Sequence, residues 1–171
     1  MFVYCLFCRT QRCKRIAQLM EIRGVKRAFS PQILRKIRKQ GENRKETADL
    51  LPGYVFLFND EAMTDYQQFY GIDGVIRRVG RAEEWYELQG ADREFALSLY
   101  EKDGVVGTMK LVEVGETVRL DDPLFNSSEG KITKIDYRKE RARVDFKFDG
   151  NDCHTWVALD DIKKLEKKET L

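Results

Sequence analysis

A short apolar run lies between residues 50 and 58, around a Pro-Gly pair. Because Pro52-Gly53 cannot sit inside a helix or a central strand, the pair marks where an element begins. The run that follows is short, apolar and rich in aromatic and β-branched residues, which predicts a strand buried on both faces. Its side chains alternate between an aromatic face (Tyr54, Phe56, Phe58) and an aliphatic face (Val55, Leu57). In a small domain, a strand that is apolar on both faces either lies within a thick core or uses one face to bind a partner.

The residues before this strand predict two strands, a helix and a hairpin. Residues 2–8 and 25–29 have strand patterns, and Thr10 is placed to cap a helix between them. The apolar positions of that helix recur at i, i+3, i+4 and i+7, at Cys13, Ile16, Ala17 and Met20. Residues 33–47 predict two strand arms joined by a polar loop at residues 40–43.

The residues after this strand continue the same domain. Residues 62–70 predict a helix with Met63, Tyr66 and Tyr70 on one side, and residues 71–79 predict a turn and a strand. Residues 91–101 predict a second helix on Phe95, Leu97 and Leu99. The order β-α-β-β-β-α-β-α predicts an α/β sandwich, with helices packed on a mainly antiparallel sheet.

The sequence pattern changes near residue 104, which predicts a second domain. Residues 104–112 contain two glycines and little periodicity, and we interpret them as a linker. Beyond it lie four short strand patterns, at residues 117–120, 131–137, 141–148 and 154–159. Regular short strands of this kind are typical of a small β-barrel. The chain is therefore expected to be α+β, with a first domain at residues 1–103 and a barrel domain at residues 113–168.

The charge of the chain is unevenly distributed. Residues 1–60 hold 13 Lys and Arg against 5 Asp and Glu, whereas residues 61–171 hold 18 against 24. A basic first third suggests that this part meets a polyanion. No stretch is apolar for long enough to span a membrane, and the amino terminus leads straight into a strand pattern, so we expect a soluble, cytoplasmic protein.

Two groups of cations stand out within the basic part. One lies on the predicted hairpin and the other at the start of the first helix. The hairpin group is Arg35, Lys36, Arg38, Lys39, Arg44 and Lys45; the helix group is Arg9, Arg12, Lys14 and Arg15. Cations at a helix amino terminus oppose the helix dipole, so an anionic ligand would explain them. The alternative for the hairpin is a solvated, mobile loop.

The cysteines and the single histidine raise the question of a metal site. Cys5-x-x-Cys8 has the spacing of zinc ligands, and Cys153-His154 would complete a set for a small zinc hydrolase. Residues three apart in a strand point to opposite faces, however, which favours reduced, partly buried thiols. Neither a catalytic set nor a phosphate-binding glycine loop is evident, so the sequence favours a binding protein without cofactor or metal over an enzyme.

The β-α-β order, the basic hairpin and the Leu51-Pro52-Gly53-Tyr54-Val55-Phe56 run together resemble the N-terminal domain of NusG-type transcription elongation factors. The second region resembles a KOW domain, an SH3-like barrel, at residues 118–120, 125, 129–132, 135–137 and 141–144. Gly130 falls on the fixed glycine of that motif, at a turn expected to need an unusual backbone angle. Within the family, the chain is more similar to the specialised paralogues RfaH and LoaP. The features that carry this similarity are Cys8-Arg9, the strongly basic first part and the compact chain. Two motifs depart from the family: Val3-Tyr4 replaces Trp-Tyr, and Pro123-Leu124-Phe125 replaces Gly-Pro-Phe.

The resemblance implies a role for several residues. Tyr4, Leu51, Tyr54 and Phe56 would line a hydrophobic depression that grips the clamp helices of the largest RNA polymerase subunit. Arg9, Arg12 and Arg15 would face non-template DNA or an RNA hairpin. The KOW domain, with Phe148 at its partner-contact loop, would bind RNA or a protein such as termination factor Rho or a ribosomal protein.

The expected function is that of a monomeric, processive antitermination factor that a nucleic-acid signal recruits to polymerase. The alternative is an RNA-binding or ribosome-associated KOW protein with no role at the polymerase.

Overall fold

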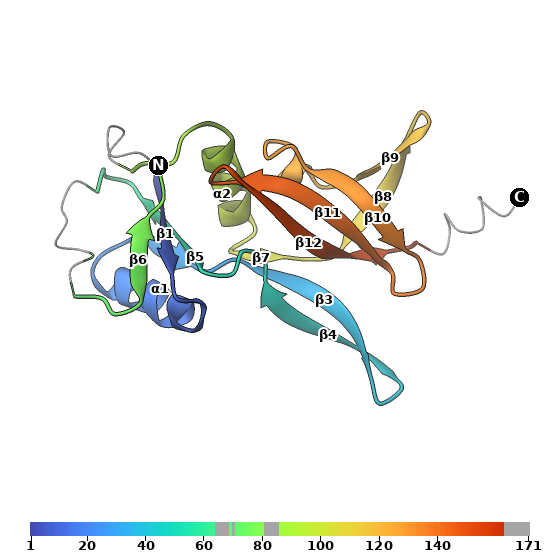
Figure 1. Cartoon of the computed structure of the whole chain (residues 1–171), viewed down its shortest axis with the longest axis horizontal. Coiled ribbons are helices and arrows are strands. Elements are labelled where there is room, and N and C mark those ends of the chain that lie inside the picture. Colours follow the sequence, from blue (N-terminus) through green and yellow to red (C-terminus); the bar gives the residue numbers. More distant parts are fainter. Residues whose placement is uncertain (64–68, 70, 81–85, 163–171) are drawn as a thin grey trace, which may run out of the picture. The chain divides into compact units, whose positions relative to one another are not determined.

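The computed structural model describes residues 1–63, 69, 71–80 and 86–162. The chain divides into two compact units. The first contains residues 1–32 and 49–104, and the second contains residues 33–48 and 105–171. The helices and the β-rich character of both units confirm the α+β class (Figure 1).

The first unit is built on a four-stranded antiparallel sheet. Its strands are β1 (Phe2–Cys8), β2 (Arg27–Phe29), β5 (Tyr54–Asn59) and β6 (Val75–Arg78). Their order in the sheet is β2-β5-β1-β6, so the strand after the Pro-Gly pair is central. Its partner β1 is in register with Tyr4 opposite Leu57 and Phe7 opposite Tyr54.

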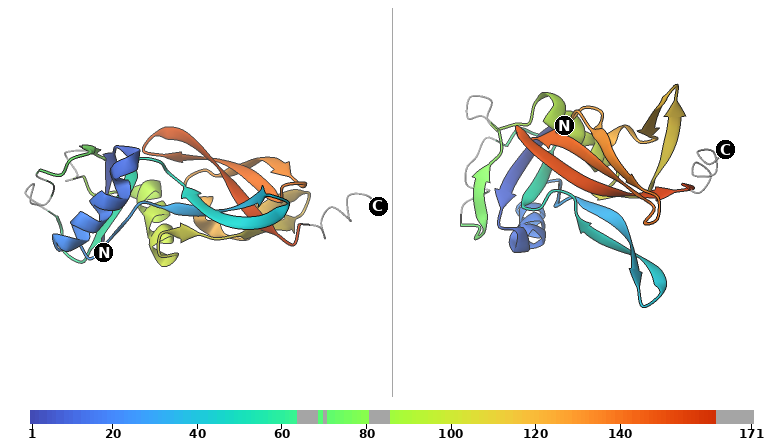
Figure 2. Two further views of the ribbon diagram at one scale, coloured as in Figure 1. Left: turned by 90° about the horizontal axis from the view of Figure 1, so that it is seen from below. Right: turned by 45° about the vertical axis from the view of Figure 1, so that its right-hand side comes forward.

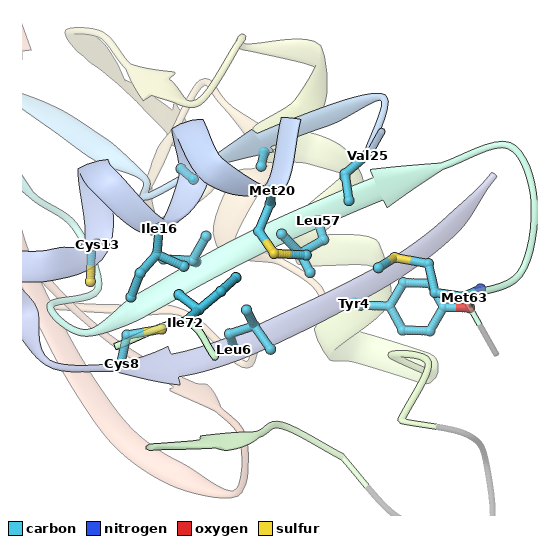
Figure 3. Close-up of a cluster of buried hydrophobic side chains, with 13 residues drawn as sticks. Tyr4, Leu6, Cys8, Cys13, Ile16, Met20, Val25, Leu57, Met63 and Ile72 are labelled. Atoms are coloured by element: carbon cyan, nitrogen blue, oxygen red, sulfur yellow. Dashed lines mark hydrogen bonds between the residues drawn. The ribbon is translucent and has the colours of Figure 1, made fainter. Parts of the chain in front are cut away.

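One face of this sheet is covered by α1 (Cys13–Ile22). All four residues of the predicted stripe are buried there, in one cluster with Leu6, Val55 and Leu57 of the strands. Figure 3 shows Ile16 and Met20 of the helix beside Leu6 and Leu57. The prediction that Thr10 caps the helix is wrong, because the chain first makes a 3-10 turn, η1 (Thr10–Arg12). Thr10 lies inside that turn, and neither η1 nor α1 has a side-chain cap.

The other face of the sheet is covered by α2 (Gly90–Glu101), which confirms the helix predicted at residues 91–101. Phe58 of β5 packs against Tyr100 of α2 with ring centroids 4.8 Å apart, and against Phe29 of β2 at 5.2 Å. The prediction that β5 is buried on both faces is therefore confirmed. The helix expected at residues 62–70 falls largely outside the described residues.

The second unit begins with the predicted hairpin, formed by β3 (Gln32–Lys39) and β4 (Glu42–Asp49). The connection is shorter than expected, because Gln40 and Gly41 alone make the turn. Their φ angles of 53° and 81° are those of a tight two-residue hairpin turn. In Figure 1 the hairpin is a long arm, and its strand β3 also pairs with the short strand β7 (Val105–Val106).

The rest of the second unit is a curled five-stranded sheet (Figure 2). Its strands are β8 (Met109–Val114), β9 (Thr117–Leu120), β10 (Lys131–Asp136), β11 (Arg141–Phe148) and β12 (Asn151–Asp160), in the order β10-β11-β12-β8-β9. A 3-10 turn, η4 (Pro123–Phe125), connects β9 to β10. The segment 104–112, expected as a linker, contains β7 and the first part of β8.

Gly130 is needed in this unit for a reason other than the expected one. A side chain there would place its Cβ 2.3 Å from Cβ of Phe125, which leaves no room for one. The left-handed backbone angle belongs instead to Glu129, with a φ of 55°. Space, and not backbone angle, therefore requires the glycine.

None of the described helices is long and apolar enough to cross a membrane.

Candidate functional site

The Pro52-Gly53 turn joins the start of β5 to the end of β1. The Tyr54 N–H donates to the Leu51 carbonyl at 3.2 Å, and Gly53 has a φ of 90°, which are the features of a type II turn. The Cys8 N–H donates to the Gly53 carbonyl at 2.7 Å. A Cβ at position 53 would lie 2.9 Å from Cε2 of Phe7, so the turn needs glycine for both its angle and its space.

Next to this turn, the aromatic face of the sheet ends in a small group that we call the aromatic rim, made of Phe7, Tyr54 and Arg77. The rings of Phe7 and Tyr54 are 5.1 Å apart, and Cζ of Arg77 lies 5.3 Å from the centre of the Phe7 ring. Arg77 is exposed, Phe7 is half-buried and Tyr54 is 9% exposed. This is where aromatic surface of the strand approaches solvent.

Sequence reasoning missed Phe7 and Arg77. Both lie in residue ranges predicted as strands. Their contact depends on which strands pair and in what register, however, and Phe7 opposes Tyr54 on one side and Arg77 on the other. The strand patterns of single segments do not contain this pairing.

The four residues expected to line one hydrophobic depression are all buried, and they do not share one face. Tyr4 faces α1, and its hydroxyl accepts a hydrogen bond from the Met63 N–H at 2.8 Å. Burial raises the pKa of Tyr4 above its ordinary value, so the hydroxyl stays protonated. Phe56 lies on the opposite face beside Phe29 and is 0% exposed, whereas Leu51 is 3% exposed. A contact between these four residues and a partner stays a prediction.

The basic group of the first helix is exposed, as a nucleic-acid surface requires. Arg9 precedes η1, Arg12 ends it, and Lys14 and Arg15 follow in α1. The first turns of η1 and α1 contain no acidic residue, so the helix dipole and the cations make this end strongly positive. One carboxylate approaches, since Asp73 lies 3.0 Å from Arg12 in an exposed ion pair.

The segment before β6 packs against the same end of the helix. The Arg9 N–H donates to the Gly74 carbonyl at 2.8 Å, and Gly74 leaves no room for a side chain because Cβ of Arg12 would lie 2.9 Å away. Strand β6 then leads to Arg77. The basic helix start and the aromatic rim are therefore linked through one short segment of the first unit.

The cations of the hairpin fall into two classes. Five are exposed: Arg35, Arg38, Lys39, Arg44 and Lys45. Lys36 differs, because its side chain is only 22% exposed and its ammonium lies between two carboxylates of the second unit, Glu140 and Asp160. Lys36 is thus placed differently from the other predicted phosphate contacts.

Phe148, expected at a partner-contact loop, is 0% exposed at the end of β11. The surface beside it is the two-residue turn Asp149-Gly150, whose φ angles of 53° and 70° join β11 to β12. A partner that meets this end of the unit would touch the turn before it touched the ring of Phe148.

The residues considered for zinc are divided between the two units, and Cys5 and Cys8 point to opposite faces of β1. Cys8 belongs to the cluster under α1, and Cys5 alternates onto the other face of β1. Burial raises the pKa of Cys8 to about 12, with the neighbouring Cys13 adding to the effect, so the thiol stays protonated. Among the described residues, no three or more His, Cys, Asp or Glu side chains are grouped to hold a metal ion.

Cys153 and His154 lie in the second unit, on the wall of a groove of about 380 Å³. Several charged side chains of this groove neutralise one another, as in the pairs Arg143–Asp145 at 2.9 Å and Lys147–Glu129 at 3.6 Å. Paired charges of both signs give neither a ligand set nor a basic track. The basic surfaces described above are therefore the stronger candidate site.

Comparison with known proteins decides the family. The family model described as "Transcription termination factor nusG" matches residues 3–96, which is more than half of the chain. The chain belongs to the NusG family. The matched residues include the sheet of the first unit, α1, the Pro52-Gly53 turn and the basic hairpin.

Relatives in the NusG family match over most of their length. The NusG of Vibrio cholerae, a transcription termination/antitermination protein, is 25% identical over 75% of this chain and 71% of its own. The NusG of Borreliella burgdorferi, of the same description, is 25% identical over 74% of each chain. The names of both relatives describe proteins of transcription termination and antitermination.

A solved structure supports the fold. The structure described as "Domain interaction in Thermotoga maritima NusG" is similar with a TM-score of 0.51, and it covers 92% of this chain and 93% of that one. At 20% identity, this likeness concerns the fold alone. It extends beyond residue 96 and therefore includes the C-terminal β domain.

Proposed function

We propose that this chain is a processive transcription antitermination factor that binds RNA polymerase during elongation. The observation that carries the proposal is the NusG match over residues 3–96, because that range contains the aromatic rim and both basic groups. The relatives from Vibrio cholerae and Borreliella burgdorferi are named termination/antitermination proteins. The proposal transfers that role to this chain.

The polymerase-binding surface is proposed to be the aromatic rim and the Leu51–Tyr54 turn beside it. Its partner would be the clamp helices of the largest subunit. Aromatic and arginine side chains together are frequent anchors of protein interfaces, and the rim offers both. Phe56 lies on the same face of the sheet as the rim and would support it from the interior, whereas Tyr4 lies on the opposite face, against α1.

Substitution of Tyr54 tests this surface. Tyr54→Ala removes one ring of the rim, and we expect the affinity for purified bacterial RNA polymerase to fall about tenfold or more. Tyr100→Ala is the matched control, since it removes a ring from the same face of the sheet at α2, away from the rim. Equal affinities for polymerase in a folded Tyr54→Ala variant and the wild type would contradict the proposed surface.

Nucleic acid is proposed to bind the exposed cations at the start of α1 and on the hairpin. Arg9, Arg12, Lys14 and Arg15 lie at the positive end of a helix, where phosphate is favoured. Arg77 of the rim would extend this surface towards polymerase. Non-template DNA and an RNA hairpin share the phosphate chemistry that these side chains recognise.

We assign the chain to the specialised paralogues, similar to RfaH and LoaP, on Cys8-Arg9 and the basic first sixty residues. In that role a nucleic-acid signal would recruit the factor to chosen transcripts. The KOW-like domain would bind Rho or a ribosomal protein through the Asp149-Gly150 turn beside Phe148.

The second candidate function is an RNA-binding or ribosome-associated protein without a polymerase role, which the basic surfaces alone would also support. A pull-down with purified polymerase distinguishes the two. Retention of polymerase by the wild type but not by Tyr54→Ala supports the first, and no retention by either supports the second.

A further inference from the structure

Lys36 is held within the second unit by three acceptors. Its ammonium donates to the Leu159 carbonyl at 2.5 Å and lies 3.3 Å from carboxylate oxygens of both Glu140 and Asp160. We call these three acceptors the ionic socket. An ammonium has three N–H donors, so this socket can satisfy all of them. The acceptors are more than 100 residues away in the sequence, on β12 and the turn before β11.

The two carboxylates of the socket are positioned by other contacts. The hydroxyl of Thr108 donates to Asp160, and this bond, together with the positive charge of Lys36, lowers the pKa of Asp160 below its ordinary 3.8. Glu140 has a left-handed φ of 49°, and its carbonyl accepts the Leu159 N–H at 2.8 Å. A glutamate is an unusual residue at such an angle, and its carboxylate accepts a hydrogen bond from the Lys36 ammonium at 3.3 Å.

The socket also distinguishes Lys36 from its neighbours. The five other cations of the hairpin are exposed, so a polyanion can reach them directly, although the charge of Lys45 also acts on Asp160 and helps to lower its pKa. Lys36 differs, because a phosphate that reached it would displace two carboxylates and would be repelled by them. The socket therefore opposes the binding of a polyanion along the hairpin.

We propose that Lys36 is an ionic latch that holds the basic hairpin on the C-terminal β domain, and that a polyanion bound to the hairpin competes with this latch. With the latch closed, β3 and β4 belong to the second unit. With the latch open, Lys36 joins the exposed cations and the hairpin binds nucleic acid more tightly.

Hydrogen exchange of the intact chain tests the latch itself. In Lys36→Gln, and in the double variant Glu140→Gln with Asp160→Asn, amides of residues 33–48 should exchange about tenfold faster, since a part-buried charged hydrogen bond is lost. Lys39→Gln is the control on the same hairpin and should leave exchange unchanged. Wild-type exchange rates in both latch variants would overturn the latch.

Binding of poly(U) RNA, measured by fluorescence anisotropy, tests the competition. The double socket variant should bind poly(U) at least several-fold more tightly than the wild type, and adding Lys36→Gln should abolish the gain. The control, Asp136→Asn with Asp161→Asn, removes two carboxylates outside the socket and should give a smaller gain that does not depend on Lys36. Equal affinity of the socket and control variants would overturn the competition.

The binding arm rests on the proposed nucleic-acid function, whereas the exchange arm does not. If all variants bind poly(U) equally poorly, the competition and the nucleic-acid role both fail, and the exchange rates still decide whether Lys36 latches the hairpin.

Discussion

Gly53 determines how the most apolar strand of the chain begins. Its φ of 90° and the 2.9 Å approach of Phe7 exclude any larger residue without rearrangement. The Pro-Gly pair predicted a turn, and the turn is there. The contact with Phe7 depends on the pairing of β5 with β1, which local sequence does not contain.

Gly53→Ala should therefore destabilise the first unit by roughly 1–3 kcal/mol, through backbone strain together with overpacking against Phe7. Chemical denaturation measures the free energy of unfolding.

Gly24→Ala is the matched control, because Gly24 has a φ of 100° but nothing within 4 Å of its missing side chain. We expect a smaller loss there, since backbone strain acts alone. An equal loss in both variants would show that the approach of Phe7 adds nothing.

At some single residues the sequence indicated an important position but not the physical reason for it. Gly130 was expected for its backbone angle, yet the angle belongs to Glu129 and the crowding comes from Phe125. Tyr4 and Phe56 were expected on one surface, yet they lie on opposite faces. Which residues of two paired strands share a face of the sheet depends on the register of the pair. The pattern of a single strand does not contain that register.

At the scale of elements, periodicity was a reliable guide where one face of an element is buried. The stripe of α1 and the bounds of β9 and β11 follow the predicted pattern. Strand β8 was missed because two glycines precede it and suggested a linker. Strand β12 begins at Asn151, three residues before the predicted strand at residues 154–159. The predicted boundaries of strands were wrong where residues typical of turns also pair within a sheet.

The start of α1 is the element whose charge carries the nucleic-acid proposal. Reversing the charge of Arg12 and Arg15 should weaken binding to nucleic acid and reduce its dependence on salt. Two lost phosphate contacts correspond to a change of roughly 1.4–1.8 in the slope of log K against log salt concentration.

Titration at several salt concentrations measures this slope. Arg23→Glu, just beyond the other end of the same helix, is the control and should leave the slope near the wild-type value. An unaltered slope in the Arg12 and Arg15 variant would remove this helix from the interface.

At the scale of the whole molecule, the sequence indicated two regions and the family resemblance that the NusG match confirms. It did not indicate that the hairpin belongs with the C-terminal unit. Lys36 and its socket are more than 100 residues apart, and such a contact has no local pattern. Charge clustering alone placed all six hairpin cations together and could not separate Lys36, which lies half-buried between two carboxylates.

In the proposed function, this chain keeps RNA polymerase transcribing through terminators by a contact at the aromatic rim. The most direct test is single-round transcription with purified bacterial RNA polymerase across a terminator. We predict that the wild-type chain and Tyr100→Ala increase read-through, whereas Tyr54→Ala leaves it at the level without factor. Read-through that the wild type does not change, or that Tyr54→Ala raises equally, would contradict the account.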